Sequence, residues 1–428
     1  MIVGIDDTDS DKGMCTTYLG ALLLEELQAY GTVEALPLLV RLNPTIPYKT
    51  RGNAAVALKL KTDCPEKVIS HVVSRIEELA RMECEKTNPG AVFILEKDYE
   101  SLKPVLGRFL KEAVRDVIEI RKAKSLISEY GIPSQGFKNG RGLIGSLAAC
   151  GAMLNLEEWD HTFEHLAYRQ KEKWGTPREV EKESFFEADR ETYPETWDTV
   201  DLTNNLVVCV PHSADPVLFG IRGDNPEIVT KAACMIRAEP VERFVVYRTN
   251  QGTDMHLLCA ANISEIRNMH SYRLEGTVSA VPKTIPGGHV IFPIRDEGGD
   301  EIDCAAFEPT KNFRVLVRKL IPGDRVILSG SVSSGTLNIE KIEIKTLVLL
   351  HTEENPKCPV CKKHMKSAGQ GQGFRCKKCG TQASSKLICE VERDLKAGLY
   401  DVPPCARRHL SKPLVREKLS GVRVFPSR

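Results

Sequence analysis

Three carboxylates stand within four residues near the start of the chain, in the segment IVGIDDTDSDKGMCTT at residues 2–17. Asp6, Asp7 and Asp9 follow an apolar run, residues 2–5, that has the pattern of a buried strand. Carboxylate oxygens are ligands that Mg²⁺ prefers, together with the oxygens of a bound phosphate. The segment therefore predicts a magnesium–phosphate site held by Asp6, Asp7 and Asp9 at the open end of a strand.

The residues that follow predict an anion site beside these carboxylates. Gly13 precedes Met-Cys-Thr-Thr and then apolar residues at helical spacing. Thr16 or Thr17 is placed to cap this helix, and the free N–H groups of a helix N-terminus attract phosphate. The alternative is a plain strand–turn–helix in which these side chains satisfy the turn and cap the helix. No GxxxxGK[ST] motif is present, so the segment is not an ordinary P-loop. The candidates for phosphate contact are Thr8, Ser10, Gly13, Cys15 and Thr17.

Two later loops also have the composition of phosphate-binding loops. YKTRGN precedes a strand-like run at residues 54–60, and GFKNGRG leads into a small-residue helix that begins near Leu143. Arginine offers a two-pronged donor to phosphate, and glycine lets backbone N–H groups approach it. Taken alone, the first loop is more often a charged hairpin turn. The candidates in the two loops are Lys49, Arg51, Gly52, Asn53, Lys138, Asn139, Gly140, Arg141 and Gly142.

Four cysteines near the C-terminus have the spacing of a zinc site. Cys358 and Cys361 form one CxxC pair and Cys376 and Cys379 a second, with 14 residues between the pairs. Four thiolates supply a tetrahedral structural Zn²⁺ site and leave no open position for catalysis. Basic residues around and beyond the pairs predict contact with a nucleic-acid backbone. The candidates are Lys362, Lys363, Lys377, Lys378, Arg407 and Arg408.

The composition is that of a soluble globular protein of 428 residues, with 42% hydrophobic and 27% charged residues. No apolar run reaches the length of a membrane span and no basic, apolar leader is present, so we expect a cytoplasmic protein without a membrane partner. The net charge of +1 hides an asymmetry, since residues 351–428 contain 17 Lys and Arg against 7 Asp and Glu, a net +10 against −9 for the rest. Such a basic segment predicts a polyanionic partner. The ten cysteines outside the CxxC pairs are scattered singly and do not indicate a disulfide framework.

Periodicity predicts the elements that position these residues. Residues 64–83 and 102–130 have helical patterns, and residues 157–200 predict a helix followed by a surface connection, with His161 and His165 on that helix. Five strand-like runs between residues 272 and 344, with a helix at 311–320, match a barrel of the OB type, which binds oligonucleotides or serves as a spacer.

The expected fold class is multidomain α+β. The expected domains are an N-terminal α/β domain at 1–197 (residues 60–135 belong to it or pack with the next domain), a small ferredoxin-like α+β domain at 198–268, an OB-fold barrel at 269–348, a zinc ribbon at 349–392 and a basic segment at 393–428.

The ordered motifs VGIDDTDS…GMCTTYL, YKTRGNAAVAL and GFKNGRGLIGSLAA, followed by the barrel and the CxxC ribbon, resemble the archaeal tRNA(Ile2) 2-agmatinylcytidine synthetase (TiaS) family over essentially the whole chain. The resemblance implies an ATP-dependent tRNA-modifying ligase with a kinase-like N-terminal domain. Such an enzyme phosphorylates the C2 oxygen of the wobble cytidine in tRNA-Ile with the CAU anticodon. It then replaces that oxygen with agmatine, so that the anticodon reads AUA.

The resemblance also implies autophosphorylation of a threonine, matched here by Thr16, and conversion of ATP to AMP and phosphates. With the chemistry above, it assigns catalysis to Asp6, Asp7, Asp9 and Thr16, with ATP, Mg²⁺ and structural Zn²⁺ as cofactors and tRNA as the partner of the basic residues. The alternative is an ATP-gated RNA- or single-strand-binding protein without base chemistry, and a weaker one is a small-molecule kinase fused to a targeting module. A pure binding protein, however, has no need of three clustered carboxylates beside a helix N-terminus.

Overall fold

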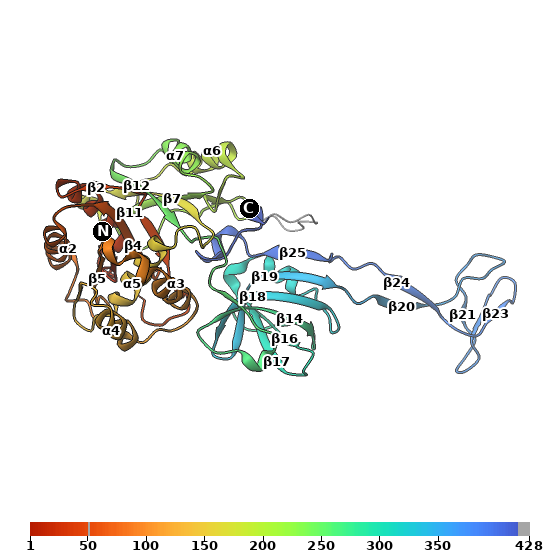
Figure 1. The fold of residues 1–428 in the computed structure, drawn as a ribbon. Coiled ribbons are helices and arrows are strands. Elements are labelled where there is room, and N and C mark those ends of the chain that lie inside the picture. Colours follow the sequence, from red (N-terminus) through yellow and green to blue (C-terminus); the bar gives the residue numbers. More distant parts are fainter. Residues whose placement is uncertain (50–51, 418–428) are drawn as a thin grey trace.

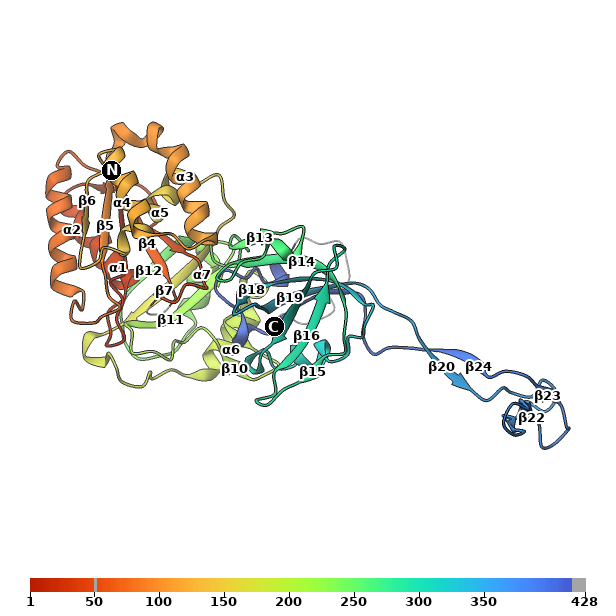
Figure 2. The same cartoon turned by 90° about the horizontal axis from the view of Figure 1, so that it is seen from below.

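The chain forms a broad α/β body, a β-barrel beside it and a long arm that ends in a small module (Figures 1 and 2). The computed structural model describes residues 1–49 and 52–417. Within these residues, no helix has both the length and the apolar character that a membrane span requires.

A ten-stranded sheet runs through the whole N-terminal body. Its order is β6-β5-β1-β4-β3-β12-β7-β11-β8, with β2 beside β4. Among the described strand pairs of this sheet, only β3 and β12 are parallel. The strands are β1 (Ile2–Asp6), β2 (Thr32–Val33), β3 (Leu38–Arg41), β4 (Ala54–Lys61), β5 (Gly90–Ile94), β6 (Ser134–Gly136), β7 (Thr162–Arg169), β8 (Thr196–Trp197), β11 (Val217–Gly223) and β12 (Val241–Thr249), and a separate pair is formed by β9 (Val200–Asp201) and β10 (Leu206–Val207).

Helices cover both faces of this sheet. Val3 and Ile5 of β1 pack in one core with α1 and α2, whereas Ile2 packs in a second core under α3, α4 and α5. Successive side chains of a strand point to opposite faces, so a strand covered on both sides buries apolar residues on both; residues 2–5 of β1 are apolar and buried, and the buried carboxylate of Asp6 follows at the strand's end. The helices are α1 (Thr16–Glu26), α2 (Pro65–Leu79), α3 (Tyr99–Arg115), α4 (Ile120–Glu129), α5 (Gly142–Leu154), α6 (Lys182–Thr192) and α7 (Pro226–Cys234).

The sequence prediction for the middle of the body was partly wrong. The expected helix within residues 157–200 is preceded by β7, an interior strand of the sheet, so His161 and His165 do not lie on a helix. The polar residues of β7 suggested an exposed segment, but Glu164 and Arg169 are buried and ion-paired. The helical pattern at 102–130 belongs to two helices, α3 and α4.

Five strands close into a barrel, as expected from the sequence. β14 pairs with both β16 and β18, and β17 pairs in parallel with β19, which completes the ring. The expected helix between the third and fourth strands is present but short, as α8 (Phe313–Val317). The barrel strands are β14 (Ser271–Val278), β16 (Val290–Arg295), β17 (Glu301–Ala306), β18 (Arg325–Ser333) and β19 (Thr336–Thr346), with β13 (Leu257–Cys259), β15 (Lys283–Thr284) and β25 (Gly398–Asp401) at its margins.

Between β19 and β25 the chain runs out and back as the arm (Figure 1). Its stalk is the antiparallel pair β20 (Leu350–Glu354) and β24 (Leu387–Val391), and its tip holds β21 (Lys366–Ser367), β22 (Phe374–Arg375) and β23 (Gln382–Ala383). The expected domain bounds remain predictions, and the one at 197/198 falls within the body, before strands β11 and β12 of the same sheet.

After β25, residues 402–417 return to the N-terminal body, and we term them the strap. The N–H of Gly252 donates to the carbonyl of His409 at 2.8 Å, and the N–H of Asp254 donates to that of Leu410 at 2.8 Å. Since β25 belongs to the barrel sheet, the strap ties the barrel to the body.

The strap corrects one predicted tRNA contact. The side chain of Arg407 is 0% exposed and pairs with Asp198 and, at 2.7 Å, with Asp401, so it cannot reach a nucleic-acid backbone. Lys412 and Arg416 both pair with Asp160. Much of the positive charge after β24 therefore neutralises carboxylates of the rest of the chain.

Replacing Arg407 by Met should lower the free energy of unfolding by about 3–5 kcal/mol, because Asp198 and Asp401 would stay buried without their nearest cation. Urea unfolding measures the change. Arg237→Gln is the matched control, since Arg237 pairs with Glu181 and Glu187 on an exposed surface and should change stability little. Equal losses in the two variants would contradict the structural role of Arg407.

Candidate active site

Helix α5 approaches the end of β1 more closely than a side chain would permit. A Cβ atom on Gly145 would lie 1.9 Å from Asp6 Oδ2, and one on Gly142 would lie 2.4 Å from the backbone N of Gly90. The first turn of α5 therefore lies directly against the Asp6 carboxylate. The N–H groups of Gly142, Leu143 and Ile144 already donate to backbone carbonyls, so this helix end favours negative charge through its positive dipole end.

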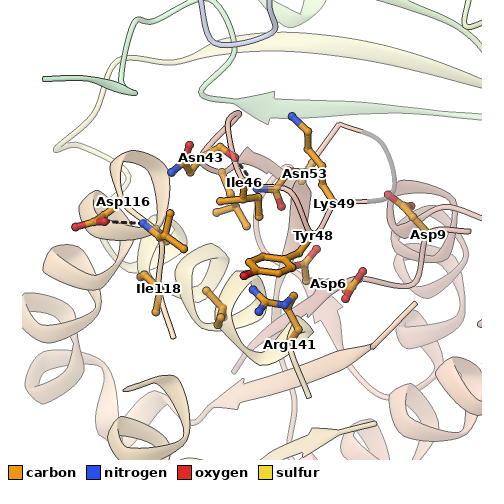
Figure 3. Close-up of a pocket in the computed structure, with 17 residues that line it drawn as sticks. Asp6, Asp9, Asn43, Ile46, Tyr48, Lys49, Asn53, Asp116, Ile118 and Arg141 are labelled. Carbon is orange, nitrogen blue, oxygen red and sulfur yellow. Dashed lines mark hydrogen bonds between the residues drawn. The ribbon is translucent and has the colours of Figure 1, made fainter. Parts of the chain in front are cut away.

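Asp6, Asp7 and Asp9 line one cavity, which is open to solvent and which we term the first cavity (Figure 3). Burial, and then the charge of Asp7, raises the pKa of Asp6 well above its usual range. Burial, and then the charge of Asp9, raises the pKa of Asp7 to about 7. Ionising the neighbouring carboxylates therefore costs free energy, and a bound cation would lower that cost.

The carboxylates of Asp6, Asp7 and Asp9 fit Mg²⁺, but their spacing limits how many of them can bind one ion. Among the described residues, only the four cysteines of the arm bring three or more potential ligand atoms within 4.8 Å of one another. Ligands of one Mg²⁺ lie about 4 Å apart or less, because each bond is about 2.1 Å long. One or two of the three aspartates, with phosphate oxygens and water, therefore match the usual Mg²⁺ coordination better than all three together.

The turn between β1 and α1 uses several of the predicted phosphate ligands internally. Ser10 Oγ donates to the carbonyl of Gly13 at 2.6 Å, and Thr8 Oγ1 donates to Thr16 Oγ1 at 3.0 Å. Thr8 and Ser10 are both fully buried. For these two hydroxyls the simpler alternative, a role in the turn itself, agrees with the structure.

The N-cap of α1 is Cys15, so the predicted caps Thr16 and Thr17 were wrong. Asp9 Oδ1 accepts the N–H of Thr16 at 2.7 Å and takes the place of a capping side chain. The Thr16 hydroxyl is almost fully buried and accepts both the N–H and the O–H of Thr8. The carbonyl of Thr17 accepts the hydroxyl of Tyr247 at 2.6 Å.

A second cavity adjoins the first at Asp9 and Asn53 and encloses about 1010 Å³ of empty space. Cys15, Thr16, Thr17 and Gly52 are among the predicted residues that line it. Its wall includes an ion network that sequence reasoning missed, in which Glu164 lies 3.1 Å from Arg222 Nε and 3.9 Å from Arg41 Nη2. These residues come from three strands and share no local motif, so only the fold brings them together.

The second glycine-rich loop contributes one side chain to the first cavity. The Arg141 guanidinium lies 4.0 Å above the ring of Tyr48, and both residues line the cavity (Figure 3). Lys138 Nζ instead donates to the carbonyl of Cys84 at 2.6 Å, and Asn139 Oδ1 accepts the N–H of Arg141 at 2.8 Å. Gly140 adopts a φ of 77°, which completes this turn.

The first loop contributes Lys49 and Asn53. Both line the first cavity; Lys49 Nζ donates to the carbonyl of Pro44, and Asn53 Nδ2 donates to that of Asn43 at 2.8 Å. Arg51, predicted to contact phosphate, lies outside the described residues.

The arm brings its four cysteines together as the spacing predicts. Cys358, Cys361, Cys376 and Cys379 place their Sγ atoms within 4.8 Å of one another, a set that fits a tetrahedral structural Zn²⁺. The neighbouring side chains predicted to contact tRNA are all exposed: Lys362, Lys363, Lys377 and Lys378.

Family models match three parts of the chain: the TiaS TCKD domain at residues 2–68, the TiaS FLD domain at 140–256 and the TiaS C-terminal zinc ribbon domain at 355–395. The chain is 80% identical to the tRNA(Ile2) 2-agmatinylcytidine synthetase TiaS of Methanosarcina acetivorans over the full length of both. It is 50% identical to that of Archaeoglobus fulgidus over 99% of both. The chain belongs to the TiaS family.

Solved TiaS structures have the same fold over nearly the whole chain. Apo TiaS has a TM-score of 0.91 at 48% identity, and the TiaS–tRNA(Ile2)–ATP complex has a TM-score of 0.88 at 48% identity. A complex of TiaS with tRNA(Ile2), AMPCPP and agmatine has a TM-score of 0.86 at 46% identity. Each comparison covers 99% of this chain and 99% of the other.

Cys376→Ser should remove bound zinc and make the tip of the arm sensitive to protease, because the arm's own core has only three buried residues, two of them predicted ligands. Metal analysis and limited proteolysis measure the two effects. Cys389→Ser is the matched control, since Cys389 lies in the stalk strand β24 outside the cysteine cluster. Full zinc content in Cys376→Ser would contradict the assignment.

Proposed function

We propose that the first cavity is the active site of an ATP-dependent ligase that converts the wobble cytidine of tRNA-Ile with the CAU anticodon to 2-agmatinylcytidine. The observation that carries the proposal is the full-length identity to TiaS synthetases in a chain whose three clustered carboxylates face one cavity. The substrates are ATP, agmatine and the tRNA. An ATP-gated RNA-binding protein without base chemistry is not favoured, because a related TiaS has been captured with tRNA(Ile2), an ATP analogue and agmatine together.

The reaction needs activation of a poor leaving group. The C2 oxygen of cytosine is amide-like and does not leave readily. Phosphoryl transfer from ATP to this oxygen converts it into a phosphate ester, and the primary amine of agmatine then attacks C2. The C2–O bond breaks, phosphate leaves and the amine loses a proton, so the product carries a C2–N bond.

The residues of the first cavity suit the phosphoryl-transfer step. One or two of Asp6, Asp7 and Asp9 would hold Mg²⁺, which when bound neutralises charge on the triphosphate. Arg141 and Lys49 place positive charge on the cavity wall and would offset charge on the transferred group. Arg51 is a further candidate from the same loop. Burial of these groups strengthens each such interaction relative to water.

Thr16 is our candidate for autophosphorylation. It follows the turn that holds the carboxylates, and its backbone N–H is fixed by Asp9. Thr16 lines the second cavity, which adjoins the first at Asp9. A phosphoryl group there would lie at the N-terminus of α1, where a helix stabilises negative charge.

The barrel and the arm would bind the tRNA. The strand pairing of the barrel, with its third and fifth strands parallel, is that of an OB fold, and such barrels bind nucleic-acid strands. The exposed lysines at the tip of the arm would contact the phosphate backbone. The target base must leave its stack to enter the cavity.

Asp9→Asn and Thr16→Val should each reduce formation of agmatinylcytidine by about 10²-fold or more while tRNA affinity changes little, because both act on phosphoryl transfer. Mass analysis of the anticodon nucleoside and filter binding give the two readouts. Asp11→Asn is the matched control, since Asp11 is exposed in the same turn and should retain activity. Full activity in either Asp9→Asn or Thr16→Val would remove the site assignment.

Replacing Lys377 and Lys378 by Ala should weaken tRNA binding and reduce the slope of log affinity against log salt by about 1–2, because binding with fewer phosphate contacts releases fewer counterions. Binding is measured at several salt concentrations. Lys61, at the end of β4, and Lys67, in α2, are exposed residues of the N-terminal body, which lies at the opposite end of the molecule from the tip of the arm (Figure 1). Their double replacement should leave the slope unchanged. An unchanged slope in the Lys377/Lys378 variant would mean that these lysines do not contact the tRNA.

A further inference from the structure

A third cavity, with about 820 Å³ of empty space, lies between the segment that follows β3 and the strap. Its charged and titratable lining consists of Arg41 and Lys49 from the body and Arg408 and His409 from the strap. Among the described residues, no Asp or Glu lines this cavity, whereas both neighbouring cavities contain carboxylates. The segment after β3 and the strap therefore meet around a space where the charged side chains of the lining residues are all positive.

The three cations are only partly neutralised by the surrounding protein. Arg408 lies 3.4 Å from Glu340, and Arg41 Nη2 lies 3.9 Å from Glu164 while its buried Nε has no hydrogen-bond partner. Lys49 Nζ donates to the neutral carbonyl of Pro44. Burial, and then the positive charge of Arg408, lowers the pKa of Lys49. The Lys49 ammonium and the Arg408 guanidinium therefore repel each other across the cavity.

His409 adds a neutral imidazole to this wall. Its Nδ1 lies 2.8 Å from Arg222 Nη2 and 2.9 Å from Gln251 Oε1. A guanidinium only donates and an amide oxygen only accepts, so these two contacts favour opposite tautomers of the ring. A Cβ atom added to Gly52 would lie 3.6 Å from His409 Nε2. Burial, and then the charges of Arg41, Arg222 and Lys49, holds the pKa of His409 well below its usual range, so the ring stays neutral.

We propose that this third cavity binds a phosphodiester group of the tRNA strand beside the modified nucleotide, held by Lys49, Arg408 and Arg41. The inference rests on the proposed function, which brings an RNA strand to the first cavity. The third cavity shares Leu42 and Lys49 with the first, so a group bound there lies next to the reacting base.

The position of Arg408 favours an RNA phosphate over a phosphate of ATP. Arg408 Nη1 donates to Ser331 of barrel strand β18 at 2.6 Å, so this cation of the cavity wall also contacts the barrel. A phosphate bound by Arg408 would therefore lie near both the barrel and the body, where an RNA strand held by the two would run. A triphosphate with its metal needs carboxylates nearby, and those line the first cavity instead.

The test measures binding of an anticodon stem-loop to the full chain and to Lys49→Gln and Arg408→Gln. Each variant should reduce the salt slope of binding by about 0.7, the value for one phosphate contact in single-stranded nucleic acid. Stem-loops with one neutral methylphosphonate at successive positions then locate the contact. At one position the methylphosphonate should weaken binding to the unaltered chain. The same stem-loop should bind the Lys49→Gln and Arg408→Gln variants with an affinity that changes by less than about twofold.

Lys412→Gln is the matched control, because Lys412 lies in the strap, pairs with Asp160 and does not line the cavity. Lys49→Arg keeps the charge and should restore the slope, and thermal unfolding of every variant separates loss of a contact from loss of the fold. Unchanged slopes in both variants would overturn the proposal. A raised KM for ATP with unchanged RNA binding would assign the cavity to ATP and equally overturn it. Absence of agmatinylcytidine formation by the unaltered chain would instead refute the proposed function.

Discussion

The proposed active site depends on the close contact between helix α5 and the end of β1. Gly142 and Gly145 bring the backbone of α5 against Asp6, at distances that leave no room for a Cβ atom. The contact buries the Asp6 carboxylate, and burial beside Asp7 and Asp9 raises the pKa values of Asp6 and Asp7. Carboxylates that are costly to ionise alone are stabilised when a cation binds. The same packing contact therefore sets the electrostatic state of the proposed metal site.

The strap gives the basic C-terminal segment a role inside the protein. Arg407 is buried between Asp198 of the body and Asp401 of the barrel sheet, and Arg416 pairs with Asp160 and Asp224. Positive charge in the strap thus compensates negative charge of the body and of the barrel sheet. Because a buried charge without its partner is costly, these pairs restrict how the strap can lie against the body. They also fix the position of the neighbouring Arg408 and His409 at the third cavity.

Local motifs predicted the elements whose chemistry depends on neighbours in sequence. The strand–turn–helix around Asp6, the five barrel strands and the cysteine cluster all follow from spacing and periodicity. The sequence failed where partners are remote. Glu164 pairs with a residue 58 positions away and Arg169 with one 70 positions away, so β7 had the composition of a polar surface segment while forming the middle of a sheet. Arg407 was predicted to lie on a basic surface for the same reason, because its partner Asp198 is remote in the sequence. His409 and Arg222 could not have been connected to the site, because their contact joins residues 187 positions apart.

The arm leaves the barrel after β19 and re-enters it at β25, and these two strands are direct neighbours, with Ile344 opposite Gly398. The whole cysteine-bearing module is therefore an insertion into what is otherwise a hairpin of the barrel. Both stalk strands pair only with each other in the described chain, so the module shares no sheet with the rest of the molecule. A lineage could lengthen, shorten or exchange this module without altering the connectivity of the catalytic body. Reach toward a distant part of the RNA can thus evolve independently of the chemistry.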